Sequence, residues 1–586
     1  MKELNNENAF FNAEELITNA PDQDFDSCLK CDFNLKESEL YDTYRVCSSC
    51  NFHFYIKPYD RLALLTDRAS FVEFNQELTN VHEYTHDELP EYKKRTKSDV
   101  ERTGLNDSVI TGIGTMGGNS CVIILMDFSF MGGNLGLVSG EKISLAIDEA
   151  VSRKIPIVSI ISSSGTRIEE GILSLMQMAK VTLSMANAKS KNIPSLSLLT
   201  NPCTGQAYIT LATYSDIILS EPGASVGMSP LKDLKGDYGS VDFESRASDS
   251  MLKRGLIDSI VNRNQQKEQI SRIIDLLNNN HKLVYENNES NKPNFSLSNL
   301  SIEERVKISL SDKRPSSSIF LKKVFENFFE IKGDRLLDNS DRIITGLAQL
   351  GSQTVMIVAQ ENINENNSID GLKSSDFRKC SRAINLASRF NIPLITFIDT
   401  VGHNMTYNEE IKGIGTSLGE TMLSMAQMSS PSISVLITRG GSEAALSLDI
   451  SDRRLMLENA ILVMGDNRDD KDSLNKPSII GAKECKDLNI VDSVIPEPVG
   501  GIHMNPDECF SLLRKFLMIE LAMLNKKSER SRFKDKYKKF RNISDFNNSY
   551  LYNLANEAIA AKGKITDYIS KKISDRKRKI RKIQSE

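Results

Sequence analysis

The sequence predicts an α/β protein that contains two copies of one domain, preceded by a small metal-binding module. Three observations point to this fold class. The middle of the chain matches itself at an offset of 237 residues, its apolar runs alternate with segments of helical character, and four of the nine cysteines lie within the first 50 residues. The length of 586 residues also exceeds one ordinary core, because domains average about 150 residues.

The repeat pairs two segments that each contain a helix, a proline, a buried strand and a turn with glycine. AIDEAVSRKIPIVSIISSSG in the first copy corresponds to AINLASRFNIPLITFIDTVG in the second. Continuous apolar runs such as Leu394–Ile398 are typical of strands that are buried on both faces of a parallel sheet. The pairs of residues that keep the offset include Pro156 and Pro393, Gly165 and Gly402, and Glu221 and Glu458.

The predicted domains follow from this repeat and from the composition of the segments around it. The segment between the two copies is rich in Asn and Ser, as linkers are. The end of the chain, KKISDRKRKIRKIQ, is typical of a solvated basic helix, the alternative being contact with a membrane surface or an acidic partner. We expect a polar extension (1–24), a zinc ribbon (25–55), a first α/β domain (56–284), a linker (285–301), a second α/β domain (302–545) and a helical basic tail (546–586).

The composition excludes several classes of protein. No apolar run approaches the roughly 20 residues that span a bilayer, and the polar, acidic N-terminus is unlike a secretory signal. The cysteines are too few for a disulfide framework in a chain of this length. We therefore expect a cytoplasmic protein without a membrane span. The net charge of −5 gives no global signal for nucleic-acid binding.

The cysteine pattern predicts a zinc site. Cys28 with Cys31, and Cys47 with Cys50, form two C-x2-C pairs separated by 15 residues, a spacing typical of zinc ribbons. Sulfur fills all four positions of the tetrahedron, so no position is left for a water and we expect the zinc to be structural. Some ribbons bind nucleic acid, but the seven acidic residues between positions 22 and 42 disfavour that role.

Turns that contain glycine follow four of the predicted buried strands. They have the sequences SSSGTR (162–167), NPCTGQA (201–207), DTVGHN (399–404) and RGGSEAA (439–445). None of the six histidines lies near a G-x-S-x-G elbow, and the sequence contains no Walker loop and no Rossmann fingerprint after a predicted strand. Two interpretations remain open. The turns are ordinary connections from strand to helix, or their N–H groups stabilise an oxyanion such as the enolate of a thioester.

The motifs of the chain resemble those of the bacterial acetyl-CoA carboxylase carboxyltransferase. The first half is similar to the beta subunit through the four-cysteine ribbon, Phe130-Met-Gly-Gly133 with Gly136, Ser163–Arg167 before Ile168-Glu-Glu170, and Leu175-Met-Gln-Met-Ala179. The second half is similar to the alpha subunit through Phe329-Glu-Ile-Lys-Gly-Asp-Arg335, Phe397-Ile-Asp-Thr400, Gly440-Gly-Ser442, Arg454-Leu-Met-Leu-Glu-Asn459 and Ile495-Pro-Glu-Pro-Val-Gly-Gly501.

This resemblance covers about residues 25 to 545 and implies both a fold and a reaction. The fold is two tandem crotonase-like (ClpP/crotonase) domains, each a spiral of ββα units. The reaction is transfer of CO2 from carboxybiotin, held on the biotin carboxyl carrier protein, to acetyl-CoA, which gives malonyl-CoA for fatty-acid synthesis. ATP is used by the partner enzyme, biotin carboxylase. The first domain holds the acyl-CoA and the second the biotin, with the site formed between two chains of a homodimer.

The resemblance also implies how the reaction proceeds without a catalytic side chain. Carboxybiotin releases CO2, and the ureido anion that remains takes the proton from the acetyl methyl group, so the protein supplies two oxyanion holes and positioning. The backbone N–H groups of the oxyanion holes would belong to Gly205, Gln206, Glu443 and Ala444. The substrate-binding residues would be Gly132, Gly133, Ser164, Gly165, Arg167, Gly402, Gly441 and Ser442.

The chain departs from the family pattern in these loops. Gln206 and Glu443 each replace the glycine of a Gly-Gly pair, and they correspond to each other at the offset of 237. The backbone N–H group remains when glycine is replaced. A residue with a side chain does not adopt a positive φ as easily as glycine, and its side chain can prevent the close approach of a substrate. The other departures are Ser164 for Gly, Val401-Gly-His403-Asn404 for Pro-Gly-Ala-Tyr, and Gln360-Glu-Asn362 for His-Gln-Lys.

Two reactive side chains in these loops are expected to have structural roles. His403 is interpreted as a loop histidine whose hydrogen bonds are satisfied, since the implied mechanism needs no base there. Cys203 is interpreted as a small packing residue, because no histidine adjoins it in the sequence. Two alternative functions stay open: transfer to another acyl-CoA such as propionyl-CoA, and a catalytically impaired scaffold or zinc-ribbon nucleic-acid binder.

Overall fold

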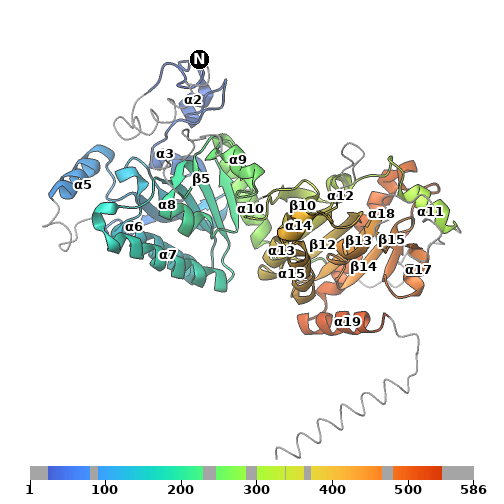
Figure 1. The fold of residues 1–586 in the computed structure, drawn as a ribbon. Helices are drawn as coiled ribbons and strands as arrows, with labels where there is room; N and C mark the ends of the chain where they lie inside the picture. Colours follow the sequence, from blue (N-terminus) through green and yellow to red (C-terminus); the bar gives the residue numbers. More distant parts are fainter. Residues whose placement is uncertain are drawn as a thin grey trace, which may run out of the picture. The chain divides into compact units, whose positions relative to one another are not determined.

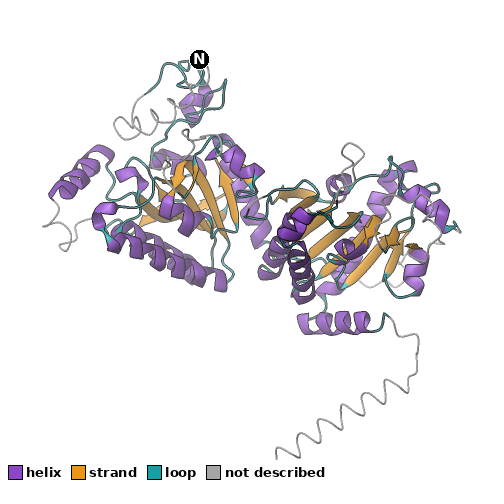
Figure 2. Ribbon diagram, in the orientation of Figure 1, coloured by secondary structure: helices purple, strands orange, loops and turns teal. Residues whose placement is uncertain are grey.

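The computed structural model describes residues 24–79, 90–228, 246–284, 298, 300–336, 338–361, 371–464 and 479–543. Residues 1–23 of the predicted extension, most of the predicted linker and the whole predicted tail lie outside the described residues. The chain forms two compact units, residues 1–533 and 534–586. Both copies of the repeated domain belong to the first unit, and each is built on its own mixed sheet (Figures 1 and 2).

The first sheet has eight strands among the described residues, in the order β1-β2-β3-β4-β5-β6-β8, with β7 beside β5. The first three strands are antiparallel, and the strands from β3 onward are parallel. Their bounds are β1 (Val72–Phe74), β2 (Val109–Met116), β3 (Asn119–Met126), β4 (Ile157–Ser163), β5 (Ser195–Thr204), β6 (Ile217–Ser220), β7 (Val226–Gly227) and β8 (Ser259–Ile260).

The second sheet repeats this plan with nine strands among the described residues. Its order is β16-β15-β13-β12-β11-β10-β9, and β14 lies between β13 and β17. The bounds are β9 (Glu326–Glu330), β10 (Ile343–Leu350), β11 (Gln353–Gln360), β12 (Leu394–Thr400), β13 (Ser432–Gly441), β14 (Arg453–Leu457), β15 (Ile461–Val463), β16 (Ile479–Gly481) and β17 (Ser493–Ile495).

Helices cover both faces of each sheet (Figure 2). Those of the first half are α2 (Glu39–Tyr44), α3 (Pro58–Leu65), α5 (Pro90–Thr103), α6 (Leu137–Arg153), α7 (Ile172–Ser190), α8 (Gly205–Ala207), α9 (Ser248–Lys253) and α10 (Gln266–Asn278). Those that follow are α11 (Ile302–Ser309), α12 (Ser317–Val324), α13 (Ser374–Arg389), α14 (Tyr407–Ile411), α15 (Ile414–Gln427), α16 (Ser442–Leu446), α17 (Ala482–Asp487), α18 (Pro506–Asn525) and α19 (Glu529–Arg541). Single turns are η1 (Met131–Gly133), η2 (Ile168–Glu170), η3 (Tyr208–Ala212), η6 (Arg263–Gln265) and η9 (Ile502–Met504).

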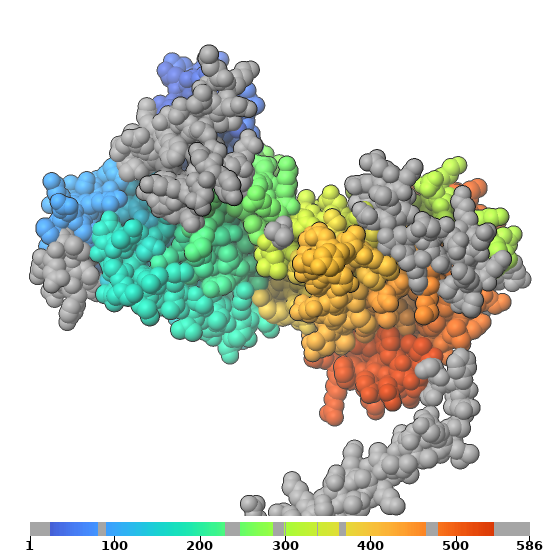
Figure 3. All heavy atoms as spheres, viewed as in Figure 1, coloured from blue at the N-terminus to red at the C-terminus, as the bar shows by residue number. Residues whose placement is uncertain are grey.

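The apolar runs of the sequence are explained by strands that contact a core on each face. In β3, Val122 and Ile124 pack with α6 on one side, whereas Ile123 and Leu125 pack with α10 on the other. Successive side chains of a strand point to opposite faces, so a strand covered on both sides needs apolar residues throughout. In Figure 3, α6 and α7 (teal) lie at the surface of the first half.

Local signals explain where several helices begin and end. Ser301 caps α11 by accepting a hydrogen bond from the Glu304 N–H, and the Glu304 carboxylate accepts one from the Ser301 N–H, which is a capping box. Pro506 begins α18, where its missing N–H has no intrahelical partner to lose. Helix α6 ends at Arg153, and the next residue, Lys154, adopts the left-handed conformation two residues before Pro156.

The bounds of the central strands confirm the repeat. Strands β4 and β12 begin and end 237 residues apart, and so do β5 and β13. The predicted α/β class with two similar sheets and an N-terminal four-cysteine module is therefore confirmed. In the part of the chain that the structure describes, no helix has the length and apolar character needed to span a bilayer.

Candidate functional site

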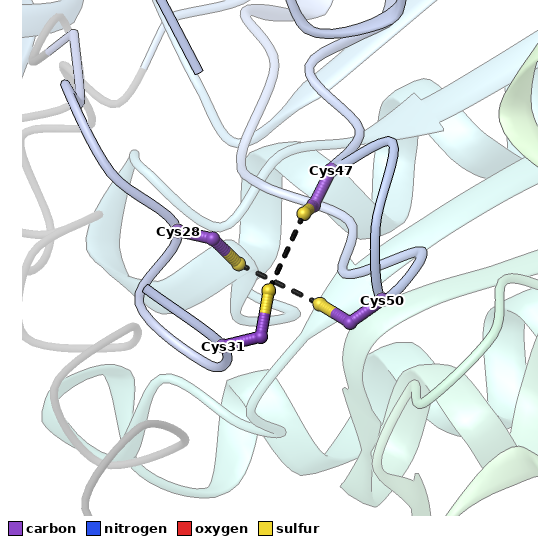
Figure 4. Close-up of side chains that lie close together, drawn as sticks. All are labelled: Cys28, Cys31, Cys47 and Cys50. Carbon is purple, nitrogen blue, oxygen red and sulfur yellow. Dashed lines mark hydrogen bonds between the residues drawn. The ribbon is translucent and has the colours of Figure 1, made fainter. Parts of the chain in front are cut away.

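The four predicted metal ligands converge at one point, as Figure 4 shows. Their Sγ atoms all lie within 4.8 Å of one another. The sulfur–sulfur distance is 3.6 Å between Cys28 and Cys50 and 3.7 Å between Cys31 and Cys47. A tetrahedral zinc with Zn–S bonds of about 2.3 Å separates its sulfurs by about 3.8 Å. The four thiols therefore have the spacing and the chemistry of a zinc site.

Both cysteine turns are built in the same way. The residue four positions after the first cysteine, Asp32 or Asn51, is left-handed with a φ of 58°. Its N–H donates to the carbonyl of that cysteine, at 2.9 Å for Cys28 and 3.0 Å for Cys47. Asp and Asn tolerate this conformation better than most residues. Asp32 and Asn51 are therefore a second sequence signal for the ribbon, in addition to the spacing of the cysteines.

Burial and hydrogen bonding act in opposite directions on the exposed thiol of the cluster. Burial raises the pKa of Cys31, but the N–H of Phe33 and the neighbouring cysteines lower it to about 7. A thiol with a lowered pKa provides more of the thiolate that binds a metal. Burial raises the pKa of Cys28 and of Cys50, so Cys31 loses its proton more readily than either of these thiols.

A buried carboxylate, Glu221, joins the ribbon to the first domain. It accepts hydrogen bonds from Arg61 at 2.7 Å and from Arg263 at 2.9 Å. Burial alone would raise the pKa of Glu221, but these two guanidinium groups hold it well below its usual range. Arg263 also donates to the carbonyls of Tyr44 and Phe54 in the ribbon. The sequence identified Glu221 as a repeated residue, but not as this connection.

The glycines of the first half meet at the carboxyl ends of β4 and β5. Gly165 has a φ of 137° and Gly205 a φ of 66°. A Cβ atom on Gly205 would lie 2.5 Å from the Gly165 Cα, so the two loops approach too closely for a side chain. A Cβ on Gly133 would lie 2.0 Å from the carbonyl oxygen of Ser162. These positions require glycine because of both their conformation and their contacts.

Backbone hydrogen bonds connect the loop of η1 with the loop after β4. The Leu135 N–H donates to the Gly165 carbonyl at 2.9 Å, and the Ser164 N–H donates to the Gly132 carbonyl at 2.9 Å. The Ser164 hydroxyl donates to the same Gly132 carbonyl and to Asn134 Oδ1. The serine that replaces a family glycine therefore stabilises the loop.

The predicted oxyanion residues of the first half differ in their surroundings. The Gly205 N–H donates to the Met228 carbonyl at 2.8 Å, so this donor is engaged within the protein. The Gln206 side chain is only 7% exposed, and its Oε1 has no hydrogen-bond partner in the described part of the chain. The N–H groups in the first turn of a helix have no intrahelical acceptor. The catalytic role of these N–H groups stays a prediction.

Arg167, one of the predicted substrate-binding residues, lies in the interior of the first half. Its side chain is fully buried, 2.7 Å from Asp107 and 3.4 Å from Glu170. Its guanidinium also lies over the ring of Phe130. Arg167 therefore holds together the loops that carry Phe130 and Gly165, and its role in substrate binding stays a prediction.

The second half reproduces the backbone of this site. Gly402 has a φ of 139°, and its N–H donates to the Thr400 hydroxyl at 3.2 Å, as the Gly165 N–H does to Ser163. The Leu372 N–H donates to the Gly402 carbonyl at 3.0 Å. A Cβ atom on Gly441 would lie 2.4 Å from the Val401 carbonyl oxygen.

Ser442 takes the place of Gly205 in the second half and adopts the same conformation, with a φ of 47°. A left-handed backbone costs a residue with a side chain about 1–2 kcal/mol, so this serine is strained. The next residues, Glu443 and Ala444, form the first turn of α16. Gln360 donates from Nε2 to the Ala444 carbonyl at 2.9 Å and so supports this turn from β11.

Two departures from the family pattern face each other at this point. His403 Nδ1 lies 3.8 Å from Glu443 Oε2. Glu443 also lines a cavity of about 410 Å³ between α16, α17 and the strands β13–β15. The predicted site residues Gly402, Gly441, Ser442 and Glu443 therefore gather at one end of the second sheet. The sequence placed His403 in the loop that contains Gly402, but it did not predict that His403 lies beside Glu443.

Cys203 lies at the carboxyl end of β5 and is fully buried. Burial raises the pKa of its thiol, so the thiol form is favoured at neutral pH. The interpretation of Cys203 as a packing residue is confirmed.

Comparison with known proteins places the chain in one family. Residues 252–544 match the family described as acetyl co-enzyme A carboxylase carboxyltransferase-like. The acetyl-coenzyme A carboxylase carboxyl transferase subunits beta/alpha of Clostridium tetani is 30% identical, with 90% of this chain and 94% of that protein covered. The beta subunit of Desulforamulus reducens is 36% identical over 42% of this chain and 86% of its own length.

The fold is also found among solved structures. A transcarboxylase 12S structure, with methylmalonyl-coenzyme A and methylmalonic acid bound, has a TM-score of 0.63 and 19% identity. It covers 80% of this chain and 90% of its own. The similarity to the fused relatives extends over nearly the whole length, through both sheets and both sets of strand-end loops. The chain therefore belongs to the family of acetyl-coenzyme A carboxylase carboxyl transferases in which the beta and alpha subunits are fused.

Proposed function

We propose that the chain transfers CO2 from carboxybiotin, held on the biotin carboxyl carrier protein, to acetyl-CoA and so forms malonyl-CoA. The observation that carries this proposal is the repeated backbone of the two strand-end loops. Gly165 and Gly205 in one half correspond in position and φ to Gly402 and Ser442 in the other. The reaction produces two anions, a thioester enolate and a ureido anion, and two backbone sites match this need.

Each half has a separate role in this proposal. The first half binds acetyl-CoA, and the second half binds the biotin that the carrier protein supplies. The N–H groups around Gln206 and Ala444 would stabilise the two anions, and the close approach of Gly165 and Gly205 would hold the first of these loops in place. Removing one donor of an oxyanion hole typically costs about 3 kcal/mol, so small changes in these loops would have large effects on rate.

A homodimer would complete the site. Apolar side chains beside both loops are exposed in the single chain: Ile168, Ile172 and Met176 in the first half, and Met405, Tyr407 and Ile411 in the second. Exposed apolar patches mark interaction surfaces, and the two patches adjoin the two predicted half-sites. We expect the first half of one chain to face the second half of its partner. Analytical ultracentrifugation should then give the mass of two chains.

Zinc is the metal that best fits the four thiols, and its role would be structural. We expect one zinc for each chain, measured by elemental analysis of the purified protein. Cys47→Ser should lower the zinc content, since it removes one of four ligands. ATP would be used by the separate biotin carboxylase, and a cytoplasmic location remains a prediction from the sequence.

The direct test combines the purified chain with biotin carboxylase, biotinylated carrier protein, ATP, bicarbonate and acetyl-CoA. Malonyl-CoA should form, and its formation should depend on the carrier protein. Absence of malonyl-CoA at every carrier concentration would contradict the proposal.

A second candidate substrate is a larger acyl-CoA such as propionyl-CoA. The observation that motivates it is the buried Gln206, which changes the predicted acyl site relative to the family pattern. Competition between acetyl-CoA and propionyl-CoA in the same assay decides between them. A higher kcat/KM for propionyl-CoA would replace acetyl-CoA as the preferred substrate.

A further inference from the structure

Glu443 and His403 form a pair at the end of the second sheet. His403 belongs to the loop after β12, and Glu443 is the second residue of α16. Their facing atoms, His403 Nδ1 and Glu443 Oε2, are 3.8 Å apart. Both residues depart from the family pattern, and they come from loops that are 40 residues apart in the sequence. Their meeting in space indicates that the two changes act together.

The carboxylate of this pair borders a cavity of about 410 Å³. This volume falls in the range of roughly 300–1,000 Å³ that is typical of small-molecule sites. The described lining is mainly apolar, with side chains such as Leu436, Met456 and Leu462. The other charged groups of the lining, Asp449 and Arg454, are ion-paired with each other at 2.6 Å.

Glu443 also remains accessible, because its side chain is 64% exposed. At the corresponding position of the first half, Gln206 is neutral and buried. Thr166 takes the place of His403 there. The carboxylate and the imidazole therefore distinguish the second half-site from the first, although the two share one backbone.

We propose that Glu443 recognises the ureido ring of biotin by accepting a hydrogen bond from the ring N–H that does not carry the carboxyl group. His403 is a positioning residue that holds the carboxylate. A cyclic urea offers N–H donors beside its carbonyl, and a carboxylate accepts such bonds more strongly than a neutral group does. This inference rests on the proposed function and assigns a specificity residue to its second half-site.

The pairing of Glu443 with His403 also bears on the negative charge that a carboxylate brings to this site. An isolated carboxylate beside the forming ureido anion would oppose that charge. His403 Nδ1 lies 3.8 Å from the Glu443 carboxylate, so the imidazole, when protonated, offsets the negative charge of the carboxylate. Binding at the neutral ring N–H also leaves the carboxylated nitrogen free to face the acyl-CoA. The carboxylate thereby orients the ring without contacting the nitrogen that reacts.

The experiment uses the full chain and biocytin, which is biotin joined to lysine, as the probe. The reaction is run in reverse, with acetyl-CoA formed from malonyl-CoA in the presence of biocytin. Glu443→Ala should raise the KM for biocytin roughly tenfold, as expected for loss of a hydrogen bond to a charged group. The KM for malonyl-CoA should not change. Glu443→Gln keeps an acceptor oxygen and should have a smaller effect.

His403→Ala tests the positioning role. It should raise the KM for biocytin about threefold, the effect of losing a partly exposed ion pair, again with no change for malonyl-CoA. His281→Ala, which changes an exposed histidine far along the sequence from either loop, is the matched control and should leave both KM values unchanged.

Several results would overturn the inference. If the carboxylate only repels the ureido anion, Glu443→Ala would lower the KM for biocytin or raise kcat. Equal increases in both KM values would indicate a general structural defect. If the wild-type chain forms no acetyl-CoA, the proposed function fails, and calorimetric binding of biocytin then tests recognition alone. Binding that Glu443→Ala weakens would support the inference, and absence of binding to the wild-type chain would contradict it.

Discussion

The strand-end loops of the two halves have the same backbone and different side chains. Gly165 and Gly402 differ in φ by only 2°, and their N–H groups make the same hydrogen bond to a hydroxyl two residues earlier. At the next loop, a glycine in the first half corresponds to the strained Ser442 in the second. The backbone has therefore been kept where the side chains have changed.

This difference indicates which part of the site the reaction needs. A backbone oxyanion hole depends on the direction of its N–H groups, and the two halves share a positive φ at the corresponding loop residues. The side chains at the same positions serve each half separately: Gln206 is buried and neutral, whereas Glu443 is exposed and paired with His403. If the proposed function is correct, the shared backbone would stabilise the two anions and the differing side chains would distinguish the two substrates.

The largest expected effect comes from the buried carboxylates that correspond at the offset of 237. Glu221→Gln should lower the free energy of unfolding by about 3–5 kcal/mol, because it leaves Arg61 and Arg263 buried without a counter-charge. Glu458→Gln should cost only about 1–2 kcal/mol, since its arginine, Arg305, is 4.0 Å away. Urea denaturation measures both. Equal costs for the two variants would contradict this comparison.

The next-largest effect should come from a substitution in the glycine loop of the first half. Gly205→Ala should lower the free energy of unfolding by about 2–4 kcal/mol, because the new Cβ meets the Gly165 Cα and the φ of 66° suits glycine. Carboxyl transfer should fall with it. Gly223→Ala also changes a glycine of positive φ, but a Cβ there has open space, so it controls for conformation alone. A cost no larger than that of Gly223→Ala would contradict the role of the contact.

A third prediction concerns the pH dependence of stability and compares Asp399 with Ser162, the neutral residue at the corresponding position of the first half. Burial raises the pKa of Asp399 to about 7, although Arg314 acts in the opposite direction. Its neutral form therefore stabilises the fold below the unfolded pKa of about 4, and this contribution is lost as the pH rises through 7. Asp399→Asn should raise the free energy of unfolding by about 1–3 kcal/mol at pH 8 and very little at pH 4. An equal change at both pH values would contradict the shift.

The smallest effect should come from relieving strain in the second half. Ser442→Gly removes a side chain from a backbone with a φ of 47°. The gain is reduced by the greater freedom of glycine in the unfolded chain, so we expect a stabilisation of up to about 1 kcal/mol. Thermal unfolding measures it. A loss of stability would mean that the serine makes a contact worth more than the strain.

The repeat and the cysteines made much of the fold predictable from the sequence. The buried strands β4 and β12 appeared as apolar runs before a glycine turn, and both have the same length in the structure. The convergence of the four cysteines followed from spacing alone, because two C-x2-C turns can direct four sulfurs to one point. The strand-end glycines were located for the same reason, since each follows a recognisable buried strand.

Side-chain partners were not predictable, because they join residues that are distant in the sequence. The fully buried Arg167 depends on Asp107, 60 residues earlier, and no periodic pattern connects the two. His403 and Glu443 likewise meet only because β12 and β13 are neighbours in the sheet. The Gly205 N–H is engaged by Met228 because β7 lies beside β5. Such contacts depend on tertiary structure rather than on local sequence.

The most direct test of the central claim follows labelled carboxyl groups from the carboxylated carrier protein to acetyl-CoA. The claim is that both halves contribute to one transfer through their strand-end loops. The wild-type chain should produce labelled malonyl-CoA, and Gly205→Ala in the first half and Gly441→Ala in the second should each reduce the rate severely, since both add a Cβ that overlaps backbone atoms. A folded variant of either kind that transfers the label at the wild-type rate would contradict the claim.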